Sequence, residues 1–309
     1  MSAAKPRART PPAGAAAATT SDASASGLPR EFAPGVYCLT VGKGLLRANV
    51  YFIRSGVSWV LVDAGAEGCA PEILAVAEVL FGAGLAPAAI LLTHDHPDHA
   101  GSAAELARKW GCCVWAHPGE MPIIQGDIVT FRKYAHPLDR WLILPLLSLL
   151  SKKQIEAIVS RGSLKGVARA LDVENSGGPA AAGAVGDAGA ADADGGTGAG
   201  SAVPGLPDWE AVPTPGHTPG HVAFFRRQDR VLVTGDALLT LGLDSIWSLV
   251  VKKPRLSGPP WYVTWNRPMA KKAVAKLAEL KPLVVAGGHG QPLSGADLSG
   301  QLRKLTAVS

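Results

Sequence analysis

Short hydrophobic runs, many of them rich in Val, Ile and Leu, recur along the chain and are closed by glycine or proline. Runs of this length and composition are typical of buried β-strands. Several of them end in an Asp or a His. We expect strands at 35–40, 49–54, 58–62, 89–93, 113–116, 210–212, 230–233 and 283–286.

Three segments between these strands, 71–80, 99–110 and 269–280, place hydrophobic residues at helical spacing. Such spacing predicts helices with one buried face. Strands that alternate with helices indicate a layered α/β fold. Folds of this class place functional groups at the ends of buried strands, which is where the Asp and His residues of this chain lie.

Two segments lack any such pattern. Residues 1–30 are mostly Ala, Ser, Thr and Pro, and 20 of the 34 residues in 172–205 are Gly or Ala, with acidic residues but no Lys or Arg. Neither segment can bury enough apolar surface to offset the entropy of ordering it. We therefore expect a disordered N-terminal tail, one domain over 31–309, and a low-complexity acidic loop inserted in that domain. A linker between two domains is the alternative for 172–205.

A further segment, 138–171, combines a strongly apolar run with charged residues. The run at 141–150 is too short to span a bilayer, and two lysines and a helical pattern up to Leu171 follow it. We expect a helical, lid-like insertion here. The alternatives are a pair of core helices, or an apolar patch for lipid-like substrates or a membrane surface.

Composition narrows the class of protein. The chain has 309 residues, of which 47% are hydrophobic, and this excludes a wholly disordered chain. The formal net charge of +5 is modest, so we expect a small-molecule substrate and no nucleic-acid partner. No apolar signal segment or membrane span is visible, which predicts a cytoplasmic protein. The Ala-, Ser- and Arg-rich tail leaves an organelle transit peptide as the alternative.

The densest group of chemically active side chains directly follows the fourth expected strand. Residues 93–101 contain three His and two Asp. His94 and His96 are two positions apart, and on extended backbone such residues point to the same side. Asp98 and His99 begin the next helical pattern, so they can face a neighbouring point. Four ligands so close together predict two adjacent metal ions rather than one.

Three other strand ends carry His217, Asp236 and His289. Imidazole and carboxylate ligands without a thiolate favour Zn²⁺, Mn²⁺ or Fe²⁺ over a structural cysteine-rich zinc site. We therefore expect two divalent metal ions, with Zn²⁺ as the first choice and Mn²⁺ or Fe²⁺ as alternatives.

Five short motifs occur along the chain in a definite order. They are Asp63 in Val-Asp-Ala-Gly, His94-x-His96-x-Asp98-His99, His217 in Pro-Gly-His, Asp236 in Thr-Gly-Asp-Ala and His289 in Gly-Gly-His-Gly. In this order they resemble the motifs of the metallo-β-lactamase-fold hydrolases, the superfamily that includes glyoxalase II and lactonases. The resemblance implies an αββα sandwich over 31–309, in which two mixed β-sheets are flanked by helices and the metals lie at one edge.

Carried over residue by residue, the resemblance implies two metal sites and a residue that orients their ligands. Site 1 would be His94, His96 and His217; site 2 would be Asp98, His99 and His289; Asp236 would bridge both; and Asp63 would orient the ligands. Three histidines match no ligand position. We expect His221 to pack beside the site, and His117 and His136 to be ordinary surface or core residues.

The resemblance also implies a dinuclear hydrolase. A water shared by two cations loses a proton near neutral pH, and the bridging hydroxide then attacks a carbonyl carbon of the substrate. The cations stabilise the oxyanion, so no Ser or Cys nucleophile is required. Asp98 is expected to carry a proton to the leaving group as well as to bind metal.

The substrate class is less closely determined. Asp236 stands where class B1 and B2 β-lactamases have Cys, and His96 stands where flavodiiron proteins have Glu, so neither activity is expected. We expect a small thioester of the glyoxalase II kind, or a lactone or other ester, with Tyr262 as a candidate substrate contact. The alternatives are a mononuclear Fe(II) persulfide dioxygenase, and a phosphodiesterase or nuclease that would use the basic cluster at 252–255.

Overall fold

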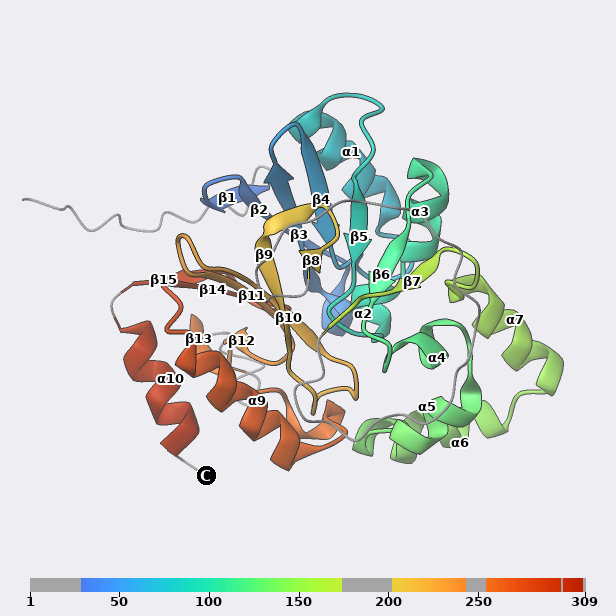
Figure 1. Ribbon diagram of the computed structural model, residues 1–309. Helices are drawn as coiled ribbons and strands as arrows, with labels where there is room; N and C mark the ends of the chain where they lie inside the picture. Colours follow the sequence, from blue (N-terminus) through green and yellow to red (C-terminus); the bar gives the residue numbers. More distant parts are fainter. Residues whose placement is uncertain (1–28, 174–201, 243–253, 296, 308–309) are drawn as a thin grey trace, which may run out of the picture.

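The computed structural model describes residues 29–173, 202–242, 254–295 and 297–307 (Figure 1). Two β-sheets lie face to face, and helices cover both outer sides. This confirms the predicted αββα sandwich. Most of the expected N-terminal tail and of the acidic Gly/Ala loop, 1–28 and 174–201, lies outside the described residues.

The first sheet has seven strands that lie side by side in chain order. Its first four strands are antiparallel, and the strands from β4 to β7 are parallel. Val62 of β4 pairs with Leu91 of β5, so the residues that follow both strands reach the same edge. The strands are β1 (Arg30–Ala33), β2 (Val36–Val41), β3 (Ala48–Ser55), β4 (Ser58–Val62), β5 (Ala89–Leu91), β6 (Val114–Ala116) and β7 (Ala168–Ala170).

The second sheet has six strands in the order β15-β14-β11-β10-β9-β8, and β11 and β14 are its parallel pair. Gly235 at the end of β11 pairs with Gly287 at the end of β14. A separate two-stranded ribbon, β12–β13, lies beside this sheet. The strands are β8 (Ala202–Val203), β9 (Leu206–Pro213), β10 (Val222–Arg226), β11 (Val231–Gly235), β12 (Leu239–Leu241), β13 (Pro254–Ser257), β14 (Val284–Gly287) and β15 (Leu293–Ser294).

Successive side chains of the central strands fill different layers, because a β-strand turns alternate residues to opposite faces. Val60 and Val62 of β4 pack between the sheets, whereas Trp59 and Leu61 pack under the helices of the first sheet. On the second sheet, Phe224 points between the sheets and its neighbour Phe225 points to the outer helices. This explains why these strands read as continuous hydrophobic runs: both of their faces are buried.

The outer helices complete the described fold, together with a helical excursion, the segment 117–167 that connects β6 to β7 (Figure 1). Within the described residues, every helix is too short or too polar to span a bilayer. The helices are η1 (Gly44–Leu46), α1 (Ala70–Phe81), α2 (Pro97–Ala100), α3 (Ala103–Trp110), α4 (Met121–Ile124), α5 (Ile128–Tyr134), the π-helix η2 (Asp139–Ile143), α6 (Leu144–Ser148), α7 (Lys152–Gly162), η3 (Trp261–Val263), α9 (Arg267–Glu279) and α10 (Leu298–Ala307).

The single helix expected at 99–110 is two helices, α2 and α3. The chain between them passes so close to the turn at Ala66 and Glu67 that any side chain at Gly101 would collide with that backbone. This close packing occurs where α2 ends and α3 begins, so the helix is interrupted there. A pattern of hydrophobic spacing carries no information about such a contact.

The helical pattern expected to reach Leu171 stops earlier. α7 ends at Gly162, and Ala168–Ala170 pairs with β6 as the edge strand β7. Gly166 adopts a φ of +88°, which a right-handed helix does not allow. The prediction of helix over this last part was therefore wrong, because pairing at the open sheet edge outweighs local helical spacing.

We predict that the packing of Trp59 contributes strongly to stability. The Trp59 ring is fully buried and stacks on Phe81, with ring centroids 4.5 Å apart. Trp59→Ala should lower the free energy of unfolding by about 3–5 kcal/mol, since it opens a large cavity. Trp141→Ala, at an exposed position, should change it by less than about 0.5 kcal/mol. Denaturant titration of both variants measures this, and equal losses would contradict the assignment of Trp59 to the core.

Candidate metal centre

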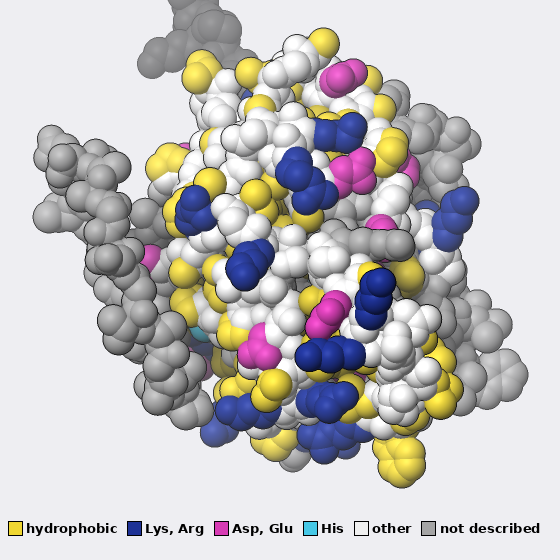
Figure 2. All heavy atoms as spheres, turned by 90° about the vertical axis from the view of Figure 1, so that its right-hand side faces the viewer, with side chains coloured by type: hydrophobic (Ala, Val, Ile, Leu, Met, Phe, Trp, Pro, Cys, Tyr) yellow, Lys and Arg dark blue, Asp and Glu magenta, His cyan; other side chains and the backbone are white. Residues whose placement is uncertain are grey.

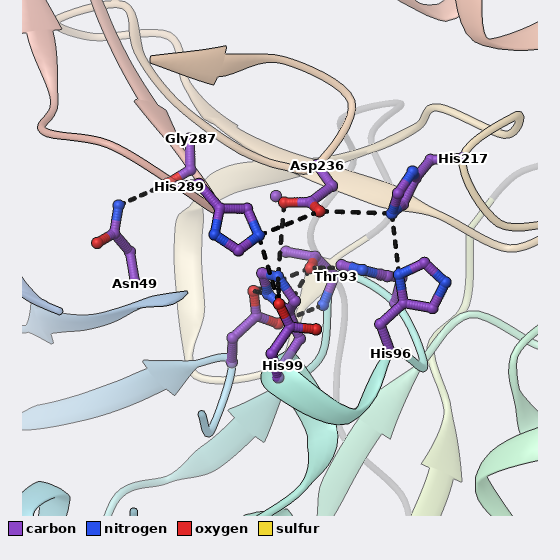
Figure 3. Close-up of polar contacts among 12 residues, drawn as sticks. Asn49, Thr93, His96, His99, His217, Asp236, Gly287 and His289 are labelled. Atoms are coloured by element: carbon purple, nitrogen blue, oxygen red, sulfur yellow. Dashed lines mark hydrogen bonds and ion pairs between the residues drawn. The ribbon is translucent and has the colours of Figure 1, made fainter. Parts of the chain in front are cut away.

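One wall of the site is the segment that links β5 to α2. His94 and His96 lie on the extended chain before the helix, and Asp98 and His99 lie in its only turn. The Thr93 hydroxyl lies 2.9 Å from His94 Nδ1 and holds that ring in place. His96 and His99 point toward the side chains of His217, Asp236 and His289 from the second sheet (Figure 3).

The opposite wall comes from three strand ends of the second sheet. His217 lies in the connection from β9 to β10, Asp236 follows β11, and His289 follows β14. The pairing of Gly235 with Gly287 brings the last two residues to the same edge. Parallel strands that end together thus deliver side chains 53 positions apart in sequence to one place (Figure 3).

The seven expected ligands meet there in two adjoining groups. His217 Nε2 lies 3.0 Å from His96 Nδ1 and 3.4 Å from Asp236 Oδ2. His289 Nε2 lies 3.4 Å from that same Asp236 oxygen and 3.4 Å from Asp98 Oδ2. Within each group the donor atoms lie within 4.8 Å of one another; the groups are His94, His96, His217 and Asp236, and Asp98, His99 and His289.

Unpaired polar atoms test whether this cluster suits a cation. Among the described residues, His94 Nε2, His99 Nε2 and Asp236 Oδ1 are buried without a hydrogen bond, and the last two atoms lie 3.5 Å from each other. A buried polar atom without a partner is costly, and three at one point indicate that something absent from the protein chain satisfies them. Imidazole nitrogens and carboxylate oxygens are donors for Zn²⁺, Mn²⁺ or Fe²⁺. The cluster therefore fits divalent metal ions.

Asp63 shapes the site from the end of β4. Its backbone has a φ of 60°, an uncommon conformation for a residue other than glycine, and its side chain is fully buried. Asp63 Oδ1 accepts the Thr93 backbone N–H at 2.8 Å, and Oδ2 lies 2.8 Å from His99 Nδ1. With the His99 Nδ1 proton donated to Asp63, the His99 Nε2 lone pair faces the cluster.

The charge balance of the site also favours cations. Burial lowers the pKa of His94 and of His217 well below the ordinary histidine value, which favours the neutral rings that metal coordination requires. Burial opposes a charge on His99 too, but nearby carboxylates, first among them Asp236, raise the pKa of His99 to about 10. The carboxylates thus draw positive charge into the site, as a proton on His99 or as a metal ion.

The loop that carries His289 is fastened to the first sheet. The Asn49 side chain donates to the carbonyl of Gly287 at 2.9 Å, and His289 Nδ1 lies 2.8 Å from the Arg47 carbonyl (Figure 3). A side chain at Gly288 would collide with Asp236 and His99. Asn49 was missed at the sequence level, although a polar residue at the start of a hydrophobic run is a signal that could have found it.

Glu120 was also missed, and it joins the two ligand-bearing walls. Its fully buried carboxylate accepts the Asp95 N–H at 2.8 Å and the Gly220 N–H at 2.5 Å. The first amide belongs to the His94–His99 segment, and the second lies three residues after His217. No spacing in the sequence links Glu120 to either segment, because the connection exists only in the folded chain.

Two histidines that match no ligand position, and the predicted substrate contact Tyr262, have the following surroundings. His221 Nε2 accepts the Asp236 N–H at 3.0 Å, so the ring packs beside the site as expected. His136 is buried, in agreement with the core alternative of the two expected for it, and its ring centroid lies 5.3 Å from that of His96. Tyr262 is only partly buried, and its ring packs edge-on against Trp261, with ring centroids 5.8 Å apart. The basic cluster at 252–255 falls mostly outside the described residues.

Comparisons with known proteins point to one family over most of the chain. The family model of the metallo-beta-lactamase superfamily matches residues 44–289. The probable metallo-hydrolase YflN of Bacillus subtilis (strain 168) is 34% identical over 288 residues, which cover 91% of this chain and 93% of that protein.

Solved structures show the same fold. The metallo-beta-lactamase family protein TTHA1429 from Thermus thermophilus superposes with a TM-score of 0.55 at 22% identity, covering 90% of this chain and 80% of that one. A beta-lactamase domain protein from Burkholderia ambifaria gives a TM-score of 0.54 at 20% identity, covering 92% and 73%.

We predict that Glu120 supports metal binding without contacting metal. Glu120→Gln should weaken metal affinity by roughly 10-fold or more, because an amide cannot accept both backbone N–H groups and the two walls separate. Glu156→Gln, at an exposed position, is the matched control. Competition with a chromogenic chelator measures the affinity. Equal affinity in Glu120→Gln and in the control would show that the hydrogen bonds of Glu120 have no effect on metal binding.

Proposed function

The chain belongs to the metallo-β-lactamase superfamily, and we propose that it is a dinuclear hydrolase of a small thioester, lactone or other ester. The observation that carries this proposal is the pair of adjoining donor groups, of which one contains Asp236 and the other approaches its carboxylate within 3.4 Å. The similarity of the chain to a probable metallo-hydrolase of Bacillus subtilis supports the same reaction class.

We assign the ligands as the motifs suggest. His94, His96 and His217 hold one ion, Asp98, His99 and His289 hold the other, and Asp236 bridges them. The short approaches of His217 and His289 to the same Asp236 oxygen support the bridging role. Asp63 is a positioning residue, since it fixes the His99 ring without reaching the cluster itself.

Two bound cations would supply the Lewis acid that polarises a carbonyl group and lowers the pKa of a water molecule. The chain's own residues then orient the substrate and move protons. Asp98 lies at the mouth of the cluster, with 15% of its side chain exposed, so it can exchange protons with a substrate as well as contact His289. We assign Asp98 as the group that carries a proton to the leaving oxygen or sulfur.

The substrate side of the site is bordered by Tyr262 and His136. The Tyr262 hydroxyl is our candidate for a hydrogen bond to the substrate. Its side chain is only partly buried, and it lies three residues before Trp265, whose backbone N–H donates to the His217 carbonyl at 3.0 Å. The neighbouring helices η2 and α6 expose apolar side chains, which suits a substrate with a hydrocarbon part. A thioester or lactone with an acyl chain meets both conditions.

Metal content tests the dinuclear assignment directly. Protein purified without added metal or chelator should contain about two divalent ions per chain, measured by inductively coupled plasma mass spectrometry. Asp236→Ala should lose most of both ions, whereas Asp229→Ala, whose carboxylate pairs with Arg226 outside the site, should keep them. About one iron per chain would contradict the dinuclear hydrolase and favour a mononuclear dioxygenase.

Asp98 is tested by separating turnover from metal binding. Asp98→Asn should lower kcat by roughly 10²–10⁴-fold on a thioester or lactone, because an amide can no longer carry the proton. The matched control is Asp229→Asn, whose carboxylate pairs with Arg226 outside the site. Metal content is measured for both variants. Full turnover in a metal-replete Asp98→Asn enzyme would remove the proton-transfer role, while leaving the ligand assignment intact.

A further inference from the structure

The helical excursion between β6 and β7 exposes large hydrophobic side chains to solvent. The exposed fraction of Trp141 is 84% and that of Leu149 is 80%, and Leu142 and Leu146 are more than half exposed. All four belong to η2, to α6 or to the residue directly after α6. Contiguous exposed apolar residues of this size mark an interaction surface, since a soluble protein ordinarily buries them.

Positive charge surrounds these apolar residues. Between positions 128 and 155 the chain contains a single acidic residue, Asp139, and that carboxylate is buried, with Oδ2 3.1 Å from His136 Nε2. The acids that flank this span are Asp127, whose side chain caps α5, and Glu156, which lies 4.0 Å from Lys152. The same span contains five exposed basic residues, which are Arg132, Lys133, Arg140, Lys152 and Lys153.

Figure 2 shows the side of the molecule on which the excursion lies, and its lower part alternates Lys and Arg side chains with hydrophobic ones. A groove of about 480 Å³ runs between α5, α6 and α7. Leu147, Leu150 and Ile155 line it, together with Arg132, Lys152 and Glu156. Its apolar lining suits a hydrocarbon chain.

We propose that the surface formed by residues 128–153 binds an anionic lipid bilayer. Trp141, Leu142, Leu146 and Leu149 enter the interfacial region, and the five basic side chains contact the anionic head groups. Apolar residues with Trp on one face and Lys and Arg around them characterise helices that lie in the plane of a membrane. Since η2 and α6 together have only ten residues, they lie on the bilayer and do not cross it.

The surface is joined to the metal centre at its base. His136 precedes η2 and contacts His96, and Tyr134 at the end of α5 packs edge-on against Trp265, with ring centroids 5.1 Å apart. Binding to a bilayer would therefore hold the site beside the membrane surface. The proposal does not depend on the reaction that the site catalyses.

Vesicle co-sedimentation tests it with the full chain in its metal-loaded form. Binding to phosphatidylcholine vesicles that contain roughly 30% phosphatidylglycerol should exceed binding to pure phosphatidylcholine by about tenfold or more, and should weaken as salt rises. The double variant Trp141→Ser/Leu149→Ser should lose about tenfold in binding to the mixed vesicles. Its matched control is Val57→Ser/Val79→Ser, which removes two exposed apolar side chains, one from the turn between β3 and β4 and one from α1.

Lys152→Gln/Lys153→Gln provides a second variant and should lose mainly the salt-dependent part of the binding. Unfolding temperature and metal content are measured for each variant, so that a folding defect is recognised. Equal binding to both kinds of vesicle, or equal binding by Trp141→Ser/Leu149→Ser and its control, would overturn the proposal. So would a dimer that becomes monomeric in that variant without any vesicle binding, since a second copy would then cover the surface.

Discussion

The arrangement of this protein depends on carboxylates that are buried beside imidazole rings between the two sheets. Asp63, Asp98 and Asp236 all lie within hydrogen-bond or ion-pair distance of His99. Negative charge cannot be kept in so enclosed a place without compensation. A proton on a histidine can compensate part of it, and divalent cations compensate it better because they also satisfy the ring nitrogens that lack a partner. The fold around the site can be understood as the means of holding this charge.

Both sheets contribute to that task, and neither could do it alone. The first sheet ends in the segment that carries four donors, and the second ends in three loops that carry one donor each. Hydrogen bonds across the gap keep the two ends together: Asn49 binds the loop before His289, and Glu120 binds the segments that carry His96 and His217. The hydrophobic layer between the sheets positions the strand ends. The hydrogen bonds of Asn49 and Glu120 then fix the loops that carry the donor side chains.

The excursion between β6 and β7 follows a different logic. Ile124 and Leu164 of this segment reach the core, whereas Trp141 and Leu149 remain exposed. Asp139, the acid of η2, is buried against His136. The excursion adds an apolar and basic surface next to the metal centre without altering the layers of the sandwich. The exposed surface can therefore change in sequence without a change in the strand ends that carry the donor residues.

The sequence by itself determined the layered class of the fold and the seven candidate ligands. Strand runs with both faces buried are continuously hydrophobic. Candidate metal ligands such as His94 and Asp236 are limited to a few residue types and lie at strand ends, so both features leave a local pattern. The tertiary structure alone decided the strand that replaces the expected helix at Ala168–Ala170, the break at Gly101, and the roles of Asn49, Glu120 and His136. Each of these follows from a contact between segments far apart in the chain. Local propensity cannot express such a contact, because the partner that makes it favourable is absent until the chain has folded.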